Sequence, residues 1–350
     1  MTKNAFHTNL SQILFLALIL IIVSCKAQND EEEEQPFPYA EGTVRIAKWQ
    51  GNKKSALNLL FDDSTYGQAM WGVPALNERH ITATWFVNPN GEYYLENKSV
   101  WENDVHQNGQ ELANHTMNHQ GASSEAEAEY EIGEAARRIW QIRGDAEFGS
   151  LMAFNPGGGT TWNSGDISGI LDKYKCIDRV KVNIGVPVKA QTISKGSSAS
   201  NMYSIVPQFI NDSNIIRLHF HGISDDDDDD DKGNGAVWIN EFKTFADKLV
   251  EMKSELWISG FIQTYKYIQE LKTATIKLEQ YSDTRYKVFL TCDKDEKYFD
   301  EPLTILVYLP KEWTNCSVTH EGKTADYPME NGVLQFDARP NMGDIVIEKK

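Results

Sequence analysis

The sequence predicts an α/β domain with a mostly parallel sheet, followed by a small all-β domain. From about residue 43 to 270, short apolar runs such as 56–61 and 215–220 alternate with longer segments of helical composition. After about residue 273, short β-branched runs are separated by turns, as expected for a sandwich. With 350 residues, 41% of them hydrophobic, the chain can build two cores. We therefore expect the domains at 43–272 and 273–350.

Segment 123–143 shows the clearest helical pattern. Ser123 and Ser124 offer an N-cap, and acidic residues follow in the first turn. Apolar residues then recur at helical spacing up to Ile142. Helices of this kind between buried strands favour a parallel sheet, either open or closed.

The N-terminus has the features of an exported protein. An apolar run at 13–23 follows Lys3 and is too short for a comfortable membrane span, so we expect a signal peptide at 1–24. The run leads into Ile-Val-Ser-Cys25, which resembles the lipobox of bacterial lipoproteins. This resemblance implies a lipid on Cys25 that anchors the protein in a membrane. The alternative is an ordinary signal peptide, or an anchor helix, with an incidental cysteine.

Residues 25–42 are acidic, contain two prolines and are expected to form a tether. An acidic stretch just after the cysteine is similar to the surface-export signal of Bacteroidetes-type lipoproteins. The similarity implies an outer-membrane lipoprotein of the bacterial cell envelope, exposed at the cell surface. The alternative is a plain solvated linker.

The net charge of -17 comes mostly from two acidic runs, at 30–34 and 225–231. Outside these twelve residues, 39 acids face 34 bases, which leaves only -5. Nucleic acid is not an expected partner, because phosphate binding needs a basic patch. We expect Asp225–Asp231 to be a solvated loop; its ligand spacing is not that of an EF-hand calcium site.

Three further cysteines remain: Cys176, Cys292 and Cys316. In an oxidising compartment Cys292 and Cys316 could pair, which would leave one free thiol. No CxxC spacing occurs, so a cysteine zinc site is not expected.

Asp62 and Asp63 directly follow the apolar run 56–61. In parallel α/β folds, functional groups collect at the carboxyl ends of strands. One of two adjacent carboxylates can bind a metal while the other acts as a base. Taken alone, the pair also fits a turn or a helix cap.

His115 and His119 have the i, i+4 spacing that places two imidazoles on one helical face. Such a pair can chelate a divalent ion, and Asp63 would complete a His-His-Asp set with open positions. The alternative is a polar helix face with two unrelated histidines. Farther on, His219 and His221 share one face of a predicted strand. His221 at its end is placed as a general acid, and His219 is interpreted as a core or supporting histidine.

These motifs occur in a specific order: LLFDDS, then HTMNH with the lead-in GQELANH, then LHFHG. The ordered set resembles the polysaccharide deacetylases, the family 4 carbohydrate esterases with a nodulation-protein-B homology domain. The resemblance extends over about 45–272, since LWISGFIQTYKYIQE is similar to the end of that domain. It implies a distorted (β/α) barrel that hydrolyses N- or O-acetyl groups on a polysaccharide.

The resemblance also implies roles for single residues. Asp62 would be the general base and His221 the acid that protonates the leaving group. Asp63, His115 and His119 would hold a divalent metal, by default zinc, with cobalt or nickel as alternatives.

Three more residues are expected at the substrate. Gly157, after Pro156, would supply an oxyanion N–H, and Trp162 and Trp238 would form the wall of a sugar cleft. One position departs from the family pattern, because Phe154 stands where the family often has an arginine that contacts the base. The family's later aspartate-rich motif has no match either, so the sequence does not show what tunes Asp62 and His221.

Two other functions fit the same motifs. One is a glycan-binding surface lipoprotein that keeps the deacetylase fold without catalysis. The other is a structural envelope protein in which a metal only holds loops together.

Overall fold

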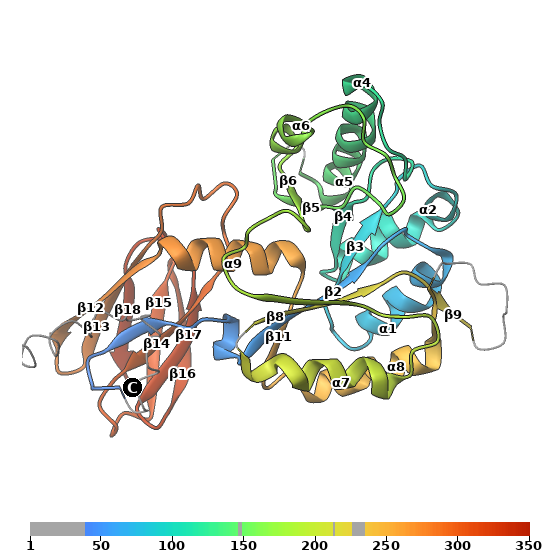
Figure 1. The fold of residues 1–350 in the computed structure, drawn as a ribbon. Helices are drawn as coiled ribbons and strands as arrows, with labels where there is room; N and C mark the ends of the chain where they lie inside the picture. The colour runs from blue at the N-terminus through green and yellow to red at the C-terminus, as the bar shows by residue number, and fades with distance from the viewer. Residues whose placement is uncertain (1–38, 146–148, 213, 226–234) are drawn as a thin grey trace, which may run out of the picture. The chain divides into compact units, whose positions relative to one another are not determined.

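Two large sheets organise the part of the chain that the structure describes (Figure 1). The structure is a computed structural model, and it describes residues 39–145, 149–212, 214–225 and 235–350. Residues 41–350 belong to one unit, to which everything below refers. The predicted signal peptide, lipidation site Cys25, most of the tether and nearly all of the aspartate run fall outside the described residues.

The first sheet is entirely parallel, with β2 (Ser55–Phe61) at its centre. Every residue of β2 is buried, as expected for a strand covered on both faces. Along the sheet the order is β6 (Cys176–Asp178), β5 (Met152–Phe154), β4 (Glu111–Asn114), β3 (Thr84–Val87), β2, β8 (Ile215–Phe220) and β7 (Val188–Thr192). β11 (Leu256–Ile258) pairs with the first half of β2 on the side where β3 pairs with its end.

The α/β prediction is confirmed, and the barrel is incomplete. Among the described residues no strand pairing joins β6 to β7, so the curved sheet has two edges instead of closing. The segment between these two edges, residues 179–187, crosses this opening.

Helices cover the parallel sheet. α7 and α8 lie side by side against β2, β8 and β11, and α5 and α6 accompany the strands β4 to β6 (Figure 1). The helices are α1 (Val73–Asn77), α2 (Glu92–Glu96), α3 (Val105–Gln107), α4 (Glu125–Ala128), α5 (Ala135–Arg143), α6 (Ser168–Lys173), α7 (Ala199–Phe209), α8 (Ile239–Glu251) and α9 (Phe261–Thr273). Short 3-10 and π-helical segments are η1 (Gln50–Asn52), η2 (Gln68–Gly72), η3 (Val100–Asp104), η4 (Glu129–Glu134) and η5 (Ile210–Asp212).

The helix expected at 123–143 is confirmed as α4, η4 and α5 in succession. The Ser124 hydroxyl caps its start by accepting the N–H of Glu127 at 3.2 Å. Within the described residues, no helix is both long and apolar enough to cross a membrane.

The second sheet is antiparallel. Its order is β1 (Val44–Ile46), β14 (Leu303–Tyr308), β17 (Val333–Ala338), β16 (Lys323–Glu330), β15 (Asn315–His320), β18 (Ile345–Lys349), β13 (Arg285–Thr291) and β12 (Thr275–Ser282). β16 pairs with β15 along its first part and with β17 at its end, so the sheet turns over into two layers around an apolar core. The all-β expectation for the C-terminal region is confirmed, and β1 from the N-terminal side adds a strand to it.

α9 joins the two sheets. At its start, the Glu111 carboxylate accepts the Ile262 N–H at 2.9 Å. In its middle, the Tyr267 hydroxyl donates to the Ala47 carbonyl at 2.8 Å, next to β1. The expected Cys292–Cys316 pairing is not found: these two thiols and that of Cys176 are free and buried, because each packs in a different place in the apolar interior.

Candidate active site

The polar residues of the site come directly after the strands of the parallel sheet. Because parallel strands end at the same edge, these residues are brought together although they are far apart in the sequence. They are Asp62 after β2, His115 after β4, Asn155 after β5, Arg179 after β6 and His221 after β8. Sequence reasoning found three of the five and missed Asn155 and Arg179.

Asp62 is buried and its carboxylate is surrounded by donors. Arg179 binds it with both terminal nitrogens, Nη1 to Oδ1 at 2.7 Å and Nη2 to Oδ2 at 2.7 Å. Oδ2 also lies 2.8 Å from His219 Nε2 and accepts the Asn155 amide at 2.9 Å. Burial would raise the pKa of Asp62, but the positive charges of His115 and Arg179 and the hydrogen bond of His219 hold it far below its usual range. These contacts favour the ionised form of Asp62.

Arg179 explains how the chain manages without the arginine expected at Phe154. Phe154 is fully buried in the apolar core, where a guanidinium would have no water. Its strand β5 pairs with β6, with Phe154 opposite Asp178, and the Arg179 N–H bonds to the Phe154 carbonyl at 3.0 Å. An arginine from the neighbouring strand thus reaches the carboxylate. The signal in the sequence was Asp-Arg after a short strand at 176–178, a strand that its apolar pattern does not reveal.

Asp63 points to a second cluster, formed with His115 and His119. Asp63 Oδ1 lies 3.1 Å from His115 Nε2 and 3.3 Å from His119 Nε2. One ligand atom from each of the three residues lies within 4.8 Å of the others, as a common metal ligand set requires. His115 Nδ1 faces the Asn155 carbonyl at 2.9 Å, which places the proton on Nδ1 and leaves the Nε2 lone pair toward the cluster. The donor set therefore fits a divalent cation such as zinc.

The two histidines do not lie on a helix, and that expectation is wrong. Residues 115–119 form an irregular loop after β4, with positive φ at Thr116 (71°) and His119 (55°). This loop doubles back, which brings the two imidazole rings to a centroid distance of 4.9 Å. The i, i+4 spacing was a correct signal for proximity, but the geometry behind it is a tight loop.

Buried side chains hold this loop in place. Glu131 accepts the Asn118 N–H at 2.9 Å and the Asn118 amide at 2.6 Å, and its own carbonyl accepts the Met117 N–H at 2.8 Å. On the other side, Asn88 donates to the carbonyls of His115 and Thr116. Glu131 and Asn88 thus fix the loop between the two histidines.

His219 and His221 stand on one face of the end of β8, as predicted. Their rings are 4.8 Å apart, and His219 supports Asp62 while His221 is half-buried next to it. Burial, together with the positive charge of His219, lowers the pKa of His221. Asp62, His219 and His221 also have ligand atoms within 4.8 Å of one another. Because Oδ2 of Asp62 already has three donors, the Asp63 cluster is the better metal site.

The expected substrate residues differ in where the structure places them. Gly157 has φ +86° and lies against His119: a Cβ there would be 2.8 Å from His119 Nε2. Trp162 is half-buried and its loop pairs with Ala122 near the same histidine. Trp238 lies on β10 (Val237–Trp238), which pairs with β9 (Ile223–Ser224), and no contact described in the structure joins it to the two clusters.

A polar cavity opens beside His119. It has a volume of about 460 Å³, within the range of ligand-binding pockets. Its lining includes Glu127, Thr160 and Asn163, together with the backbone of Gly121 and Gly159. The cavity can accept a hydroxyl-rich ligand next to the Asp63 cluster.

This geometry agrees with a comparison of the sequence with protein families. Residues 50–163 match the model of the family described as polysaccharide deacetylase. Residues 50–163 are therefore similar to the polysaccharide deacetylase family. The matched segment includes both aspartates, His115, His119 and Gly157, whereas Arg179 and His221 lie beyond it.

Solved structures similar to this chain are distant. A family 4 carbohydrate esterase from Streptomyces lividans, in complex with acetate, is 20% identical with a TM-score of 0.38, covering 61% of this chain and 95% of its own. A peptidoglycan deacetylase from Bacillus subtilis is 15% identical with a TM-score of 0.38, covering 62% and 92%. A mutant of a family 4 pseudoenzyme from Bacillus anthracis, with restored activity, is 16% identical with a TM-score of 0.40, covering 61% and 68%. No curated protein sequence matches the chain.

Proposed function

We propose that this protein is a metal-dependent hydrolase that removes acetyl groups from a polysaccharide at the bacterial cell envelope. The observation that carries the proposal is the pair of neighbouring clusters. Asp62 is held ionised by Arg179, and one residue farther along the chain Asp63 faces His115 and His119. A permanently ionised carboxylate beside a ligand set with open positions is the arrangement that hydrolysis of an acetyl group needs.

Asp63, His115 and His119 would hold the cation, by default zinc, with cobalt or nickel as alternatives. When bound, it would polarise the acetyl carbonyl and lower the pKa of water. The chain's own residues supply the rest. Gly157 would offer its N–H to the negative oxygen that develops on the carbonyl.

Proton transfer would involve the two oxygens of Asp62 unequally. Among the described residues Oδ2 has three polar partners, namely Arg179 Nη2, the Asn155 amide and His219 Nε2, whereas Oδ1 accepts only from Arg179 Nη1. Oδ1 therefore has a free lone pair to take a proton from the attacking water. His221 in its protonated form would give a proton to the departing amine or alcohol, and its lowered pKa makes that form a stronger acid that is populated at lower pH.

A second function, glycan binding without catalysis, is favoured by one observation. The low pKa of Asp62 makes it a weak base, so the fold could hold a glycan and cleave nothing. The site does not distinguish N-acetyl from O-acetyl substrates, because both present the same carbonyl group.

Acetate release distinguishes hydrolysis from binding. The metal-loaded protein is incubated with chitin oligomers, poly-N-acetylglucosamine and acetylated xylan, and acetate and bound metal are measured together. Hydrolysis predicts acetate from at least one substrate, with Asp62→Asn inactive although metal remains bound. Full metal occupancy with no acetate from any of the substrates would support glycan binding instead.

The envelope location depends on Cys25, which lies outside the described residues. We propose that its lipid holds the protein in the outer membrane, with the catalytic domain at the cell surface. In a bacterial host, Cys25→Ser should move the protein from the membrane fraction to the soluble fraction. Surface display is checked by adding protease to intact cells, and protection of the wild-type protein would contradict it.

A further inference from the structure

A second cavity lies at the opening of the parallel sheet. Its lining does not include Asp63, His115 or His119, which are called the metal ligand cluster below. It has a volume of about 420 Å³ and lies between the edge strand β7, the strand β8 and the chain that follows β6. Its lining combines apolar side chains (Leu60, Val180, Val182, Val188 and Ala190) with Gln191 and Thr192. Arg179 and Arg217 add positive charge, His219 adds an imidazole, and no acidic residue that the structure describes lines this cavity.

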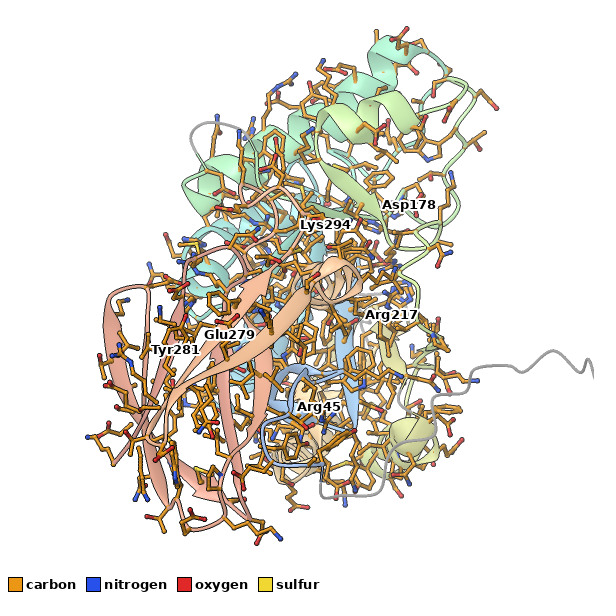
Figure 2. The ribbon with its side chains drawn as sticks, turned by 90° about the vertical axis from the view of Figure 1, so that its left-hand side faces the viewer. Arg45, Asp178, Arg217, Glu279, Tyr281 and Lys294 are labelled. Carbon is orange, nitrogen blue, oxygen red and sulfur yellow. The ribbon has the colours of Figure 1, made fainter. Side chains whose placement is uncertain are left out.

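Arg217 is the unusual residue of this cavity. It is only 7% exposed, and its Nη1 donates to the Arg179 carbonyl at 3.2 Å. Its guanidinium packs on the Phe261 ring, 4.5 Å from the ring centroid. Nε and Nη2, the two donors that form one edge of the guanidinium fork, are buried and have no hydrogen-bond partner among the described residues. In Figure 2, Arg217 is labelled on the same side of the view as Asp178 at the end of β6, and on the opposite side from Glu279 and Tyr281 of β12.

The two arginines of the cavity differ in how their charge is balanced. Arg179 has Asp62 as a bidentate partner. Arg217 has no such anion, and its pKa is lowered to about 10 by burial and by the positive charge of Arg179. A buried guanidinium without an anion destabilises a fold, and an apolar side chain of similar size would avoid that cost. The charge is therefore best explained by a ligand.

We propose that this cavity binds a carboxylate, which pairs with the free Nε–Nη2 edge of Arg217. This edge matches the two oxygens of a carboxylate in spacing and plane. Nε and Nη2 lie below the protein surface, so the proposal requires the Arg217 side chain to turn from Phe261 into the cavity when the carboxylate binds. The volume and the apolar lining suit a sugar acid, in which the carboxylate is carried by a hexose ring. A small free carboxylate such as acetate offers the same chemistry.

The proposal does not depend on deacetylase activity, so it is tested by binding alone. Isothermal titration of the full chain with D-glucuronate and with acetate measures both sources of the carboxylate. D-Glucose is the matched neutral ligand and should not bind. Binding of glucuronate would assign the site to sugar acids, whereas binding of acetate only would assign it to small carboxylates.

Variants locate the binding. Arg217→Met should weaken carboxylate binding by roughly ten- to a hundredfold, because a hydrogen-bonded charge pair is lost. Arg217→Lys keeps the positive charge but cannot bind a carboxylate with two parallel N–H groups, so its affinity should lie between those of the wild type and Arg217→Met. Lys189→Met is the control: it removes one positive charge from the exposed side of β7 and should bind as the wild type does.

Two results would overturn the proposal. One is that neither carboxylate binds the wild type in the millimolar range. The other is equal affinity of wild type, Arg217→Met and Arg217→Lys, which would place the carboxylate elsewhere, for example at the metal ligand cluster. Circular dichroism of each variant shows that it is folded, and Arg217→Lys keeps the test valid if Arg217→Met does not fold.

Discussion

Arg179, directly after β6, binds both oxygens of Asp62 at 2.7 Å. The Phe86 ring packs on the Arg179 guanidinium, with its centroid 4.4 Å away, and so supports this contact. The contact fixes the ionised state and the orientation of the proposed base. Four predictions test this site and the fold that supports it.

Replacement of Arg179 should damage the proposed reaction without unfolding the site. Arg179→Met removes two charge-assisted hydrogen bonds, so acetate release should fall by about 10- to 100-fold in kcat. Arg179→Lys should be intermediate, since an ammonium cannot bind bidentately. Arg138→Met, on the exposed side of α5, is the matched control and should keep full activity. Unchanged kcat in Arg179→Met would mean that Asp62 is not the base.

Gly157 should be indispensable to the geometry of His119. In Gly157→Ala the new Cβ would lie 2.8 Å from His119 Nε2, so the ring must move out of the ligand cluster. Metal content, measured by atomic emission after dialysis, should fall. Gly159→Ala is a close control, because Gly159 also has positive φ (+72°) but nothing lies within 4 Å of its Cβ. Equal metal loss in both variants would show that backbone strain, and not the clash, is responsible.

Glu131 should act on metal binding through the loop that it anchors. Glu131→Gln exchanges one acceptor oxygen for a donor, so the bonds to the Asn118 N–H and amide cannot both persist. Mutation of a residue that holds metal ligands in position through hydrogen bonds typically lowers metal affinity by about 10- to 100-fold. A competition titration with a chelator measures the change. Glu134→Gln, in the same π-helical segment, should leave affinity unchanged; a melting-temperature loss with wild-type affinity would limit Glu131 to a structural role.

Stability should fall with rising pH because of Glu270 on α9. Burial raises the pKa of Glu270 to about 8, and that of the neighbouring Glu301 to about 7. A raised carboxyl pKa favours folding below the unfolded pKa near 4.5, and this contribution is lost as pH rises toward 8. Glu270→Gln cannot ionise, so its melting temperature relative to wild type should increase between pH 5 and pH 8.

The exposed Glu279 on β12 provides the control for this pH effect. Glu279→Gln should leave the difference from wild type constant over the same pH range, because the pKa of Glu279 is lowered by Lys277. If the Glu270→Gln difference is also constant with pH, Glu270 is already ionised in the folded protein over this range and its pKa is not raised.

Much of the fold was predictable because its signals are local. The buried run of β2 and the alternation in β8 follow from apolar periodicity, as does the helix at 125–143 with its Ser124 cap. Strands such as β6 and β7 were not predicted, because β6 has three residues and β7 is mostly exposed. β1 was expected in the first domain and pairs with β14 instead, a partner more than 250 residues away that no local pattern reveals.

The cluster of Asp63, His115 and His119 was predictable from the sequence, but the residues that hold it in place were not. Asp63, His115 and His119 occur in short motifs, and carboxylate and imidazole groups at such spacing indicate a cation site. Asn155, Arg179 and Glu131 carry no motif, since each becomes functional only through a contact with a residue far along the chain. The helix expected for HTMNH failed for the same reason: Asn88 and Glu131 hold that segment in a loop that its own propensity does not specify.

The sequence by itself determined the alternation of buried strands with helices, the motifs that resemble those of the polysaccharide deacetylases and which residues could bind a cation. Only the tertiary structure decided which arginine partners Asp62, that the sheet stays open between β6 and β7, and that Arg217 is left at that opening without an anion. The physical reason is that residue type and periodicity act within a few residues. Charge pairing and burial are settled only when distant strands meet at one edge of a sheet.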